Sequence, residues 1–159
     1  MASRSKPTDR APVIRRFRRG YRWDEIELEP YKLEGHEGSD FRGASRQVLI
    51  GKHGEQVGFH LRYFELEPGG FTTLERHRHS HVVIGVRGRG RIRVGDSDYS
   101  VAAFDTVYVA PDKPHQLSAI GRANFGFFCV VNAKRDRPVG LSESIADDRS
   151  RMKRLKGRP

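Results

Sequence analysis

The chain has 159 residues, a formal net charge of +10, a hydrophobic fraction of 36% and a mean hydropathy of -0.69. This length is typical of one domain with a core of its own. No apolar run approaches the roughly 18 residues that cross a bilayer, no secretory signal pattern is visible, and a single cysteine excludes an internal disulfide. We therefore expect a cytoplasmic protein without membrane contact.

The excess of positive charge lies in two terminal segments. Residues 1–22 carry eight Lys and Arg against one Asp, and residues 142–159 carry six against three Asp and Glu. The first segment predicts a flexible basic arm, and the second predicts a basic tail or a short helix capped by Ser144 and Asp147. We expect both to be solvated and to contact nucleic acid only non-specifically, although the composition of the arm also fits an organelle transit peptide.

Residues 23–141 form the predicted domain, in which short apolar runs alternate with turn sequences rich in Gly, Pro and Asp. This spacing predicts an all-β antiparallel barrel or sandwich, preceded by a helical turn or edge segment over residues 23–31. The predicted strands are Gln47–Ile50, Phe59–Glu67, Phe71–Arg76, His81–Val86, Arg91–Val94, Asp98–Val101, Thr106–Val109, His115–Ala119 and Phe125–Val131.

A cluster of metal-binding residue types lies in the segment GGFTTLERHRHSHVVIGVRG. Glu75, His77, His79 and His81 occupy alternate positions there, and alternate side chains of an extended strand share one face. The cluster directly precedes the apolar run VVIGV, which has to be buried. Divalent ions bind imidazole nitrogen and carboxylate oxygen, so a metal site is favoured over a set of solvated surface histidines.

The sole cysteine, Cys129, lies in the last predicted strand of the domain. Phe125, Phe127, Cys129 and Val131 share one face of that strand, and an inward face would look into the barrel. A lone buried cysteine usually acts as a small apolar side chain, whereas a thiolate beside a metal cavity would be a nucleophile. The strand pattern is compatible with both roles.

Two segments carry a resemblance to a known family. The pattern G-x5-E-x-H-x3-H-x6-G, from Gly69 to Gly88, resembles the first motif of the cupin superfamily, with the usual first His and the Glu exchanged. The segment FDTVYVAPDKPHQL resembles the second motif and aligns His115 with its histidine. This copy departs from the motif at four positions, with Phe104 for Gly, Ala110 for Pro, Asp112 for Gly and Ala119 for Asn.

The resemblance covers residues 45–133 and implies a jelly-roll β-barrel with a metal inside. It implies that the ligands are Glu75, His77, His81 and His115. His79 has the same parity and could compete as a ligand, but the motif gives it no ligand position, so we expect it instead to hold a neighbouring ligand by a hydrogen bond. Sites of this kind in cupins commonly hold Mn or Fe. We expect Mn, with Fe, Ni, Co and Zn as chemically acceptable alternatives, and a homodimer joined by edge strands.

The segments FHLRYFELEPGGFTTLERHRHSH, FDTVYVAPDKPHQ and FGFFCVVNAKRDRP resemble a narrower group, the bacterial methylthioxylulose 5-phosphate methylsulfurylase-like cupins. This resemblance implies sulfur-transfer or lyase chemistry on a methylthio-ketose phosphate, with Cys129 as the attacking thiolate and an external thiol such as glutathione. The candidate phosphate-binding residues are Arg62, Arg87, Arg91 and Arg93. The alternative functions are an iron-dependent cupin dioxygenase and a non-catalytic module that binds a metal or a small ligand.

Overall fold

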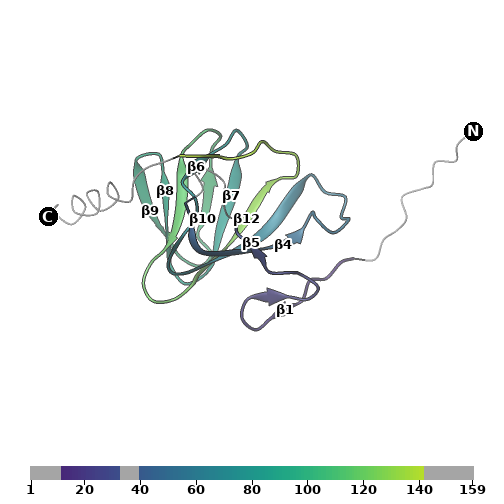
Figure 1. The fold of residues 1–159 in the computed structure, drawn as a ribbon. Helices are drawn as coiled ribbons and strands as arrows, with labels where there is room; N and C mark the ends of the chain where they lie inside the picture. The colour runs from purple at the N-terminus through teal and green to yellow at the C-terminus, as the bar shows by residue number, and fades with distance from the viewer. Residues whose placement is uncertain (1–11, 33–39, 142–159) are drawn as a thin grey trace, which may run out of the picture.

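The computed structural model describes residues 12–32 and 40–141, and all regular secondary structure in these ranges is β (Figure 1). Eleven strands form one sheet that curves into a jelly-roll barrel, and β1 and β2 form a separate hairpin. The described ranges accordingly contain no helix that could span a membrane. The predicted all-β, antiparallel fold is confirmed.

The strands are β1 (Phe17–Arg18), β2 (Arg22–Trp23), β3 (Glu29–Pro30), β4 (Arg42–Ile50), β5 (Phe59–Phe71), β6 (Glu75–Arg76), β7 (His81–Arg87), β8 (Gly90–Val94), β9 (Ser97–Val101), β10 (Thr106–Val109), β11 (His115–Ala119), β12 (Phe125–Asn132) and β13 (Val139–Gly140). The segment before the barrel is an edge strand rather than a helical turn, because β3 pairs with β4.

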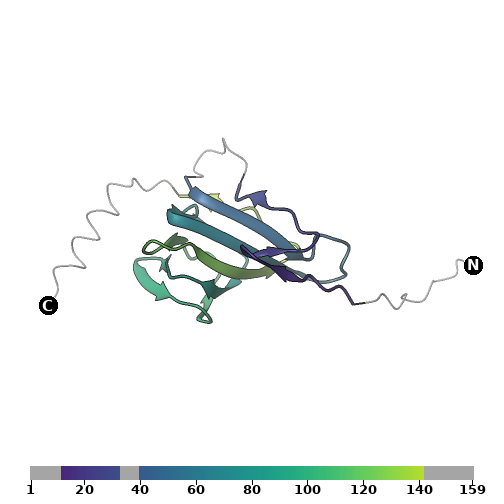
Figure 2. The same ribbon diagram turned by 90° about the horizontal axis from the view of Figure 1, so that it is seen from below.

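Strand β5 belongs to both layers of the barrel. Along most of its length it pairs with β4 on one side and with β12 on the other, and β7 and β10 follow β12. Its last residue reaches the second layer, where β11 pairs with β8 and with β6. Figure 2 shows the long strands β4, β5 and β12 side by side in one layer.

The sequence Pro68-Gly69-Gly70 was predicted to end a strand, but β5 continues through it to Phe71. The pairing with β4 shifts register here, which marks a β-bulge. Gly69 has a φ of 74°, and its carbonyl accepts a hydrogen bond of 2.9 Å from Nη2 of Arg42. The glycine therefore bends the strand from one layer into the other without ending it.

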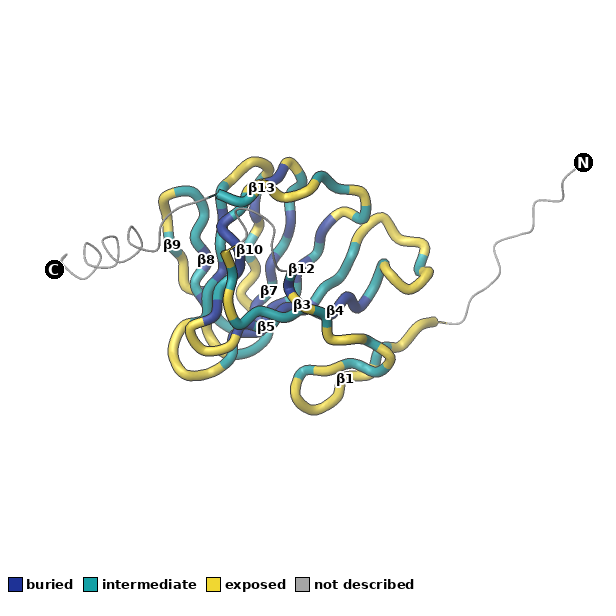
Figure 3. The backbone as a smooth tube through the Cα atoms, viewed as in Figure 1, coloured by how far each residue is buried: buried dark blue, intermediate teal, exposed yellow. Residues whose placement is uncertain are grey.

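The core lies between the two layers and is lined by the inward faces of the long strands (Figure 3). Phe125, Phe127, Cys129 and Val131 are all at most 2% exposed, so the predicted inward face of this strand is confirmed. Gly90 is required by close packing, because a Cβ atom there would lie 2.1 Å from the ring of Phe125.

The hairpin β1–β2 packs against the outside of the barrel near β4 and β5 (Figure 1). Tyr21 stacks on Tyr63 of β5 with ring centroids 5.8 Å apart, and Trp23 contacts Tyr63 at 4.9 Å and Phe128 at 6.0 Å. The carbonyl of Tyr21 also accepts a hydrogen bond of 2.8 Å from Nε2 of Gln47. These contacts bury aromatic surface at the entrance of the chain into the domain.

The prediction of a flexible arm over residues 1–22 is therefore wrong for residues 12–22. Aromatic residues interspersed with the arginines hold this part on the barrel, and two of the arginines have acidic partners: Arg15 Nη1 lies 2.9 Å from Glu25 Oε2, and Arg18 Nε lies 2.6 Å from Asp24 Oδ1. The remaining part of the predicted arm and the predicted C-terminal tail or short helix, residues 142–159, lie outside the described residues.

Two departures from the second cupin-like motif coincide with unusual backbone conformations. Phe104 and Asp112, which stand in place of glycines of the motif, have φ values of 72° and 61°. Few non-glycine residues adopt this left-handed region, because Cβ then crowds the backbone. Phe104 is held in it by hydrogen bonds with β7, since its amide donates to the carbonyl of Gly85 at 2.9 Å. Its ring contributes little packing, because the residue is 88% exposed.

Replacement of Phe104 by glycine should therefore stabilise the barrel. We expect the free energy of unfolding of Phe104→Gly to rise by about 1 kcal/mol, because the left-handed conformation costs a glycine little. Urea denaturation at equal protein concentration measures this change. The matched control is Tyr99→Gly, another exposed aromatic residue, which lies in β9 without a positive φ and should be destabilised. A loss of stability in Phe104→Gly would contradict the prediction.

Candidate metal centre

The histidine-rich segment is a turn between two strands. β6 ends at Arg76 and β7 begins at His81, so residues 77–80 belong to neither strand, and the chain bends at residues 78 and 79. The alternation of a single strand, from which the common face of these side chains was predicted, therefore does not apply across the turn. What brings the histidines together is instead the meeting of strand ends, because His115 at the start of β11 pairs directly with Glu75 of β6.

Three imidazoles converge at this point. His77, His81 and His115 each offer a ring nitrogen, and these nitrogens all lie within 4.8 Å of one another. The three residues are 5%, 8% and 3% exposed, so the cluster is withdrawn from bulk water. Three buried imidazoles are a donor set that suits Mn, Fe, Co, Ni or Zn.

The hydrogen bonds of the three rings leave one nitrogen of each for a metal. His77 Nδ1 lies 2.6 Å from the carbonyl oxygen of His79, and His115 Nδ1 lies 2.8 Å from that of Lys113. A carbonyl only accepts, so Nδ1 carries the proton and Nε2 keeps its lone pair. In His81, Nδ1 lies 3.1 Å from Cys129 Sγ, and Nε2 is buried without a hydrogen-bond partner among the described residues.

Burial also keeps these imidazoles in the form that binds metals. The loss of solvation lowers the pKa of His77 and His115 below the usual range and lowers the pKa of His81 to about 2. All three rings are therefore neutral at physiological pH. The unpartnered Nε2 of His81, together with this neutral donor set, shows that the residues fit a divalent metal.

Glu75, the predicted carboxylate ligand, lines the same cavity but is not one of the three clustered groups. Its Oε2 accepts a hydrogen bond from Nζ of Lys32, and this ion pair is largely buried. Oε1 has no hydrogen bond with any of the residues described, so one oxygen stays available to a cation. The role of Glu75 as a metal ligand stays a prediction.

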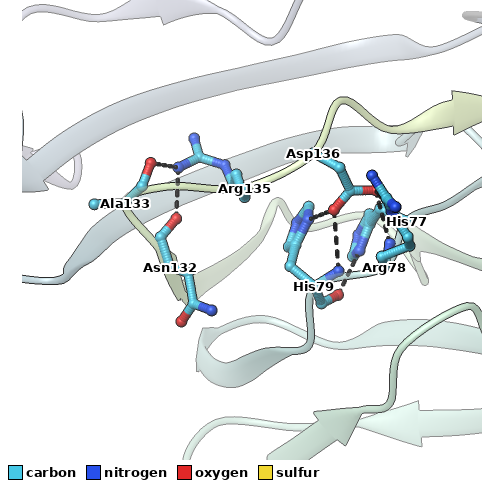
Figure 4. Close-up of polar contacts among 7 residues, drawn as sticks. All are labelled: His77, Arg78, His79, Asn132, Ala133, Arg135 and Asp136. Atoms are coloured by element: carbon cyan, nitrogen blue, oxygen red, sulfur yellow. Dashed lines mark hydrogen bonds and ion pairs between the residues drawn. The ribbon is translucent and has the colours of Figure 1, made fainter.

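The carboxylate of Asp136 fixes the shape of the histidine turn (Figure 4). Oδ2 accepts a hydrogen bond of 2.8 Å from the Arg78 amide, while Oδ1 accepts one of 3.1 Å from the His79 amide and lies 2.8 Å from His79 Nδ1. These donors, the Arg78 amide first, hold the pKa of Asp136 well below its usual range. The ring of His79 in turn stacks on His77, with centroids 3.6 Å apart and planes at 4°.

His79 was predicted to orient a ligand by a hydrogen bond. The structure places it outside the three-histidine cluster, and it is the carbonyl of His79 rather than its ring that bonds His77. The sequence did not predict the carboxylate of Asp136, which holds this turn. Asp136 is 57 residues from His79, and the single acidic residue in KRDRP carries no local signal of a long-range contact.

Cys129 faces the cavity beside the cluster. Its Sγ lies 3.1 Å from His81 Nδ1 and accepts a hydrogen bond of 3.3 Å from Nη2 of Arg62. Burial raises the pKa of the thiol, and the positive charges of Arg62 and Arg135 act in the opposite direction. The effect of burial is the larger one, so the pKa of the thiol stays above its usual value.

The cavity has a volume of about 180 Å³ and is rich in cations. Of the four arginines predicted to bind phosphate, only Arg62 lines it. Arg87 instead lies 3.5 Å from Glu65 and stacks over Tyr21, outside the cavity. The prediction missed the other lining cations, which are Lys32, Arg46 and Arg135.

The fold agrees with comparisons to known proteins. Residues 62–131 match the Cupin_2 family, described as "Cupin domain". The chain is similar to 1-methylthio-D-xylulose 5-phosphate methylsulfurylase of Rhodospirillum rubrum, with 44% identity over 125 residues that cover 79% of this chain and 78% of that protein. With this match and the barrel described above, the chain belongs to the cupin family.

Two solved structures resemble the whole domain. A cupin 2 conserved barrel domain protein from Rhodopseudomonas palustris has 37% identity and a TM-score of 0.73, covering 89% of this chain and 93% of that one. A cupin-2 domain protein from Rhodospirillum rubrum has 39% identity and a TM-score of 0.71, covering 91% of this chain and 97% of that one. The cupin jelly roll predicted from the two motifs is confirmed.

Removal of one clustered imidazole should abolish metal-dependent stabilisation. We expect Mn(II) at about 100 times its Kd to stabilise the wild-type protein by about 2.7 kcal/mol and to leave His115→Ala unchanged, because metal binding is linked to the native state. Thermal unfolding with and without Mn(II), together with elemental analysis, measures both effects. His53→Ala, an exposed histidine outside the cavity, is the control and should behave as wild type. Equal stabilisation of His115→Ala would exclude His115 from the site.

Loss of the Asp136 carboxylate should weaken metal binding without removing a ligand. Asp136→Asn replaces an acceptor of three hydrogen bonds, and we expect about 10-fold to 100-fold weaker Mn(II) binding. Isothermal titration with Mn(II) gives the Kd. Asp96→Asn, in the β8–β9 turn and not among the cavity residues, is the control for loss of charge. An unchanged Kd for Asp136→Asn would mean that the turn keeps its shape without this carboxylate.

Proposed function

We propose that the protein is a metal-dependent sulfur-transfer enzyme that removes the methylthio group of a methylthio-ketose phosphate and passes it to an external thiol such as glutathione. The observation that carries this proposal is the contact of 3.1 Å between Cys129 Sγ and His81 Nδ1, which puts a thiol beside the candidate metal ligands in one cavity. The name of the Rhodospirillum rubrum relative supports the same reaction. We propose Mn as the metal.

In the first step, the Cys129 thiolate attacks the sulfur of the methylthio group. A bond forms between the two sulfur atoms, and the bond between sulfur and C1 breaks, with its electron pair passing to C1 and the adjacent ketone oxygen. A divalent cation held by the three histidines, and by Glu75 if its free oxygen joins them, would supply a Lewis acid for this oxygen. Protonation of C1 yields the 1-deoxy-ketose phosphate and leaves a methyl disulfide on Cys129.

The second step restores the cysteine. The thiolate of the external thiol attacks the methylthio sulfur, forms its own methyl disulfide and releases the Cys129 thiolate. Carbon gains the two electrons that the sulfur pair loses, so no further oxidant or reductant is needed. The chain contains one cysteine, so an internal thiol cannot take the place of the external one.

The neighbours of Cys129 suit this role. Arg62 Nη2 donates a hydrogen bond to Sγ, and Nδ1 of His81 donates a second when it carries the ring proton. Both bonds are stronger to a thiolate than to a thiol. The bond from Arg62 opposes the effect of burial on the thiol pKa, and in the proposed step both donors would stabilise the thiolate as it attacks.

The proposal predicts that Cys129→Ser loses sulfur transfer while it keeps metal and fold. With Mn-loaded protein, 1-methylthioxylulose 5-phosphate and glutathione, we expect turnover to fall at least about 1000-fold, because a hydroxyl is a far poorer nucleophile toward sulfur. Mass spectrometry of the 1-deoxy product and of the glutathione methyl disulfide measures the reaction. Metal content and thermal midpoint serve as controls for an intact site.

Two outcomes would contradict the proposed function. Turnover of Cys129→Ser equal to wild type would return Cys129 to a packing role. Product formation that needs Fe(II) and stops without oxygen would identify a dioxygenase, whereas sulfur transfer proceeds anaerobically with Mn(II).

A further inference from the structure

The four cations that line the cavity differ in their partners. Nζ of Lys32 donates to the Glu75 carboxylate, and Arg46 lies 3.0 Å from Glu29 Oε2. Arg62 and Arg135 have no carboxylate partner among the described residues. While Cys129 is a thiol, the cavity wall thus holds two positive charges that have no acidic partner in the described part of the protein.

Arg62 and Arg135 face the same part of the cavity. Arg62 lies in β5 opposite Cys129 of β12. Its guanidinium lies over the ring of Phe64, 4.9 Å from the ring centroid. Arg135 comes from the loop after β12 and turns back toward β5, where its Nη1 lies 3.2 Å from Nδ1 of His60. The positive charge of Arg62, after burial, is a cause of the lowered pKa of Arg135, so the two guanidiniums repel each other.

Both guanidiniums are held in place and still have donors to offer. Nη1 of Arg135 donates to the carbonyl oxygens of Asn132 and Ala133 at 2.8 and 3.3 Å (Figure 4). Nε of Arg62 is buried and has no hydrogen-bond partner among the described residues. Two half-buried guanidiniums favour the binding of an oxyanion, because each keeps N–H groups that have no acceptor among the described residues.

We propose that Arg62 and Arg135 form an oxyanion subsite that binds the phosphate of the substrate. Their two charges match a phosphate monoester dianion, which would remove the repulsion between them. The identity of this ester rests on the proposed function, but the binding of inorganic phosphate to the pair does not. The same donors could take a carboxylate of the external thiol, so the test includes both ligands.

The test is titration of inorganic phosphate into the full-length, Mn-loaded protein, followed by calorimetry. We expect Arg135→Gln and Arg62→Gln each to weaken phosphate binding about tenfold or more, as expected for loss of a charged hydrogen-bond donor. Arg89→Gln, an exposed arginine of the β7–β8 turn, removes the same charge outside the cavity and should bind phosphate as wild type does. Metal content is measured for every variant.

A second titration uses glutathione under the same conditions. Weakened glutathione binding with unchanged phosphate binding in Arg135→Gln would assign the pair to the thiol and overturn the proposal. Phosphate binding that survives both arginine substitutions and disappears in His115→Ala would assign the anion to the metal and overturn it as well. Weaker phosphate binding in all three arginine variants would show a non-specific charge effect and would also overturn it.

A kinetic measurement separates this subsite from the proposed function. If the wild-type enzyme turns over the methylthio-ketose phosphate, Arg135→Gln should lower its preference for the phosphorylated over the unphosphorylated ketose about tenfold or more. An unchanged preference would overturn the subsite and leave the sulfur-transfer function intact. If no sulfur transfer is found but phosphate binding depends on both arginines, the subsite stands and the proposed function fails.

Discussion

The pairing of Glu75 in β6 with His115 in β11 is the constraint on which the candidate site depends. This contact brings the start of β6 against the start of β11, and His81 at the start of β7 lies beside both. The ring nitrogens then meet in a space from which water is largely excluded. Each Nδ1 is already bonded to protein, so the opposite nitrogens are oriented before any cation arrives.

The loop after β12, which carries Arg135 and Asp136, contacts both the histidine turn and the β5 side of the cavity. Asp136 holds the turn that presents His77, while its neighbour Arg135 reaches the side of the cavity formed by β5 (Figure 4). The two side chains leave the loop in different directions, and both are anchored by backbone groups. The position of the loop therefore sets the geometry of the histidine turn and of the cationic wall together.

Local sequence patterns predicted what depends on local geometry. Two-residue alternation identified the buried face of β12 with Cys129, and the resemblance to the two cupin motifs selected the three histidines that converge, together with Glu75. The patterns failed where distant segments meet. The ion pair of Glu75 with Lys32, the contact of Asp136 with the histidine turn and the entry of Arg135 into the cavity each join segments without periodic spacing. The aromatic residues that hold the hairpin on the barrel lie among arginines, and the charge of this segment led to the prediction of a flexible arm.

The exchange of Glu and His within the first motif has a chemical consequence at Cys129. In the usual order a carboxylate would stand at position 81, where this chain places an imidazole 3.1 Å from the thiol. A carboxylate at that distance would repel a thiolate and raise its pKa further. The neutral imidazole can donate a hydrogen bond to it instead, and the carboxylate at position 75 is paired with Lys32. The exchange thus keeps a carboxylate and the imidazoles in the cavity. It also puts an imidazole rather than a carboxylate beside Cys129, which is compatible with a thiolate there.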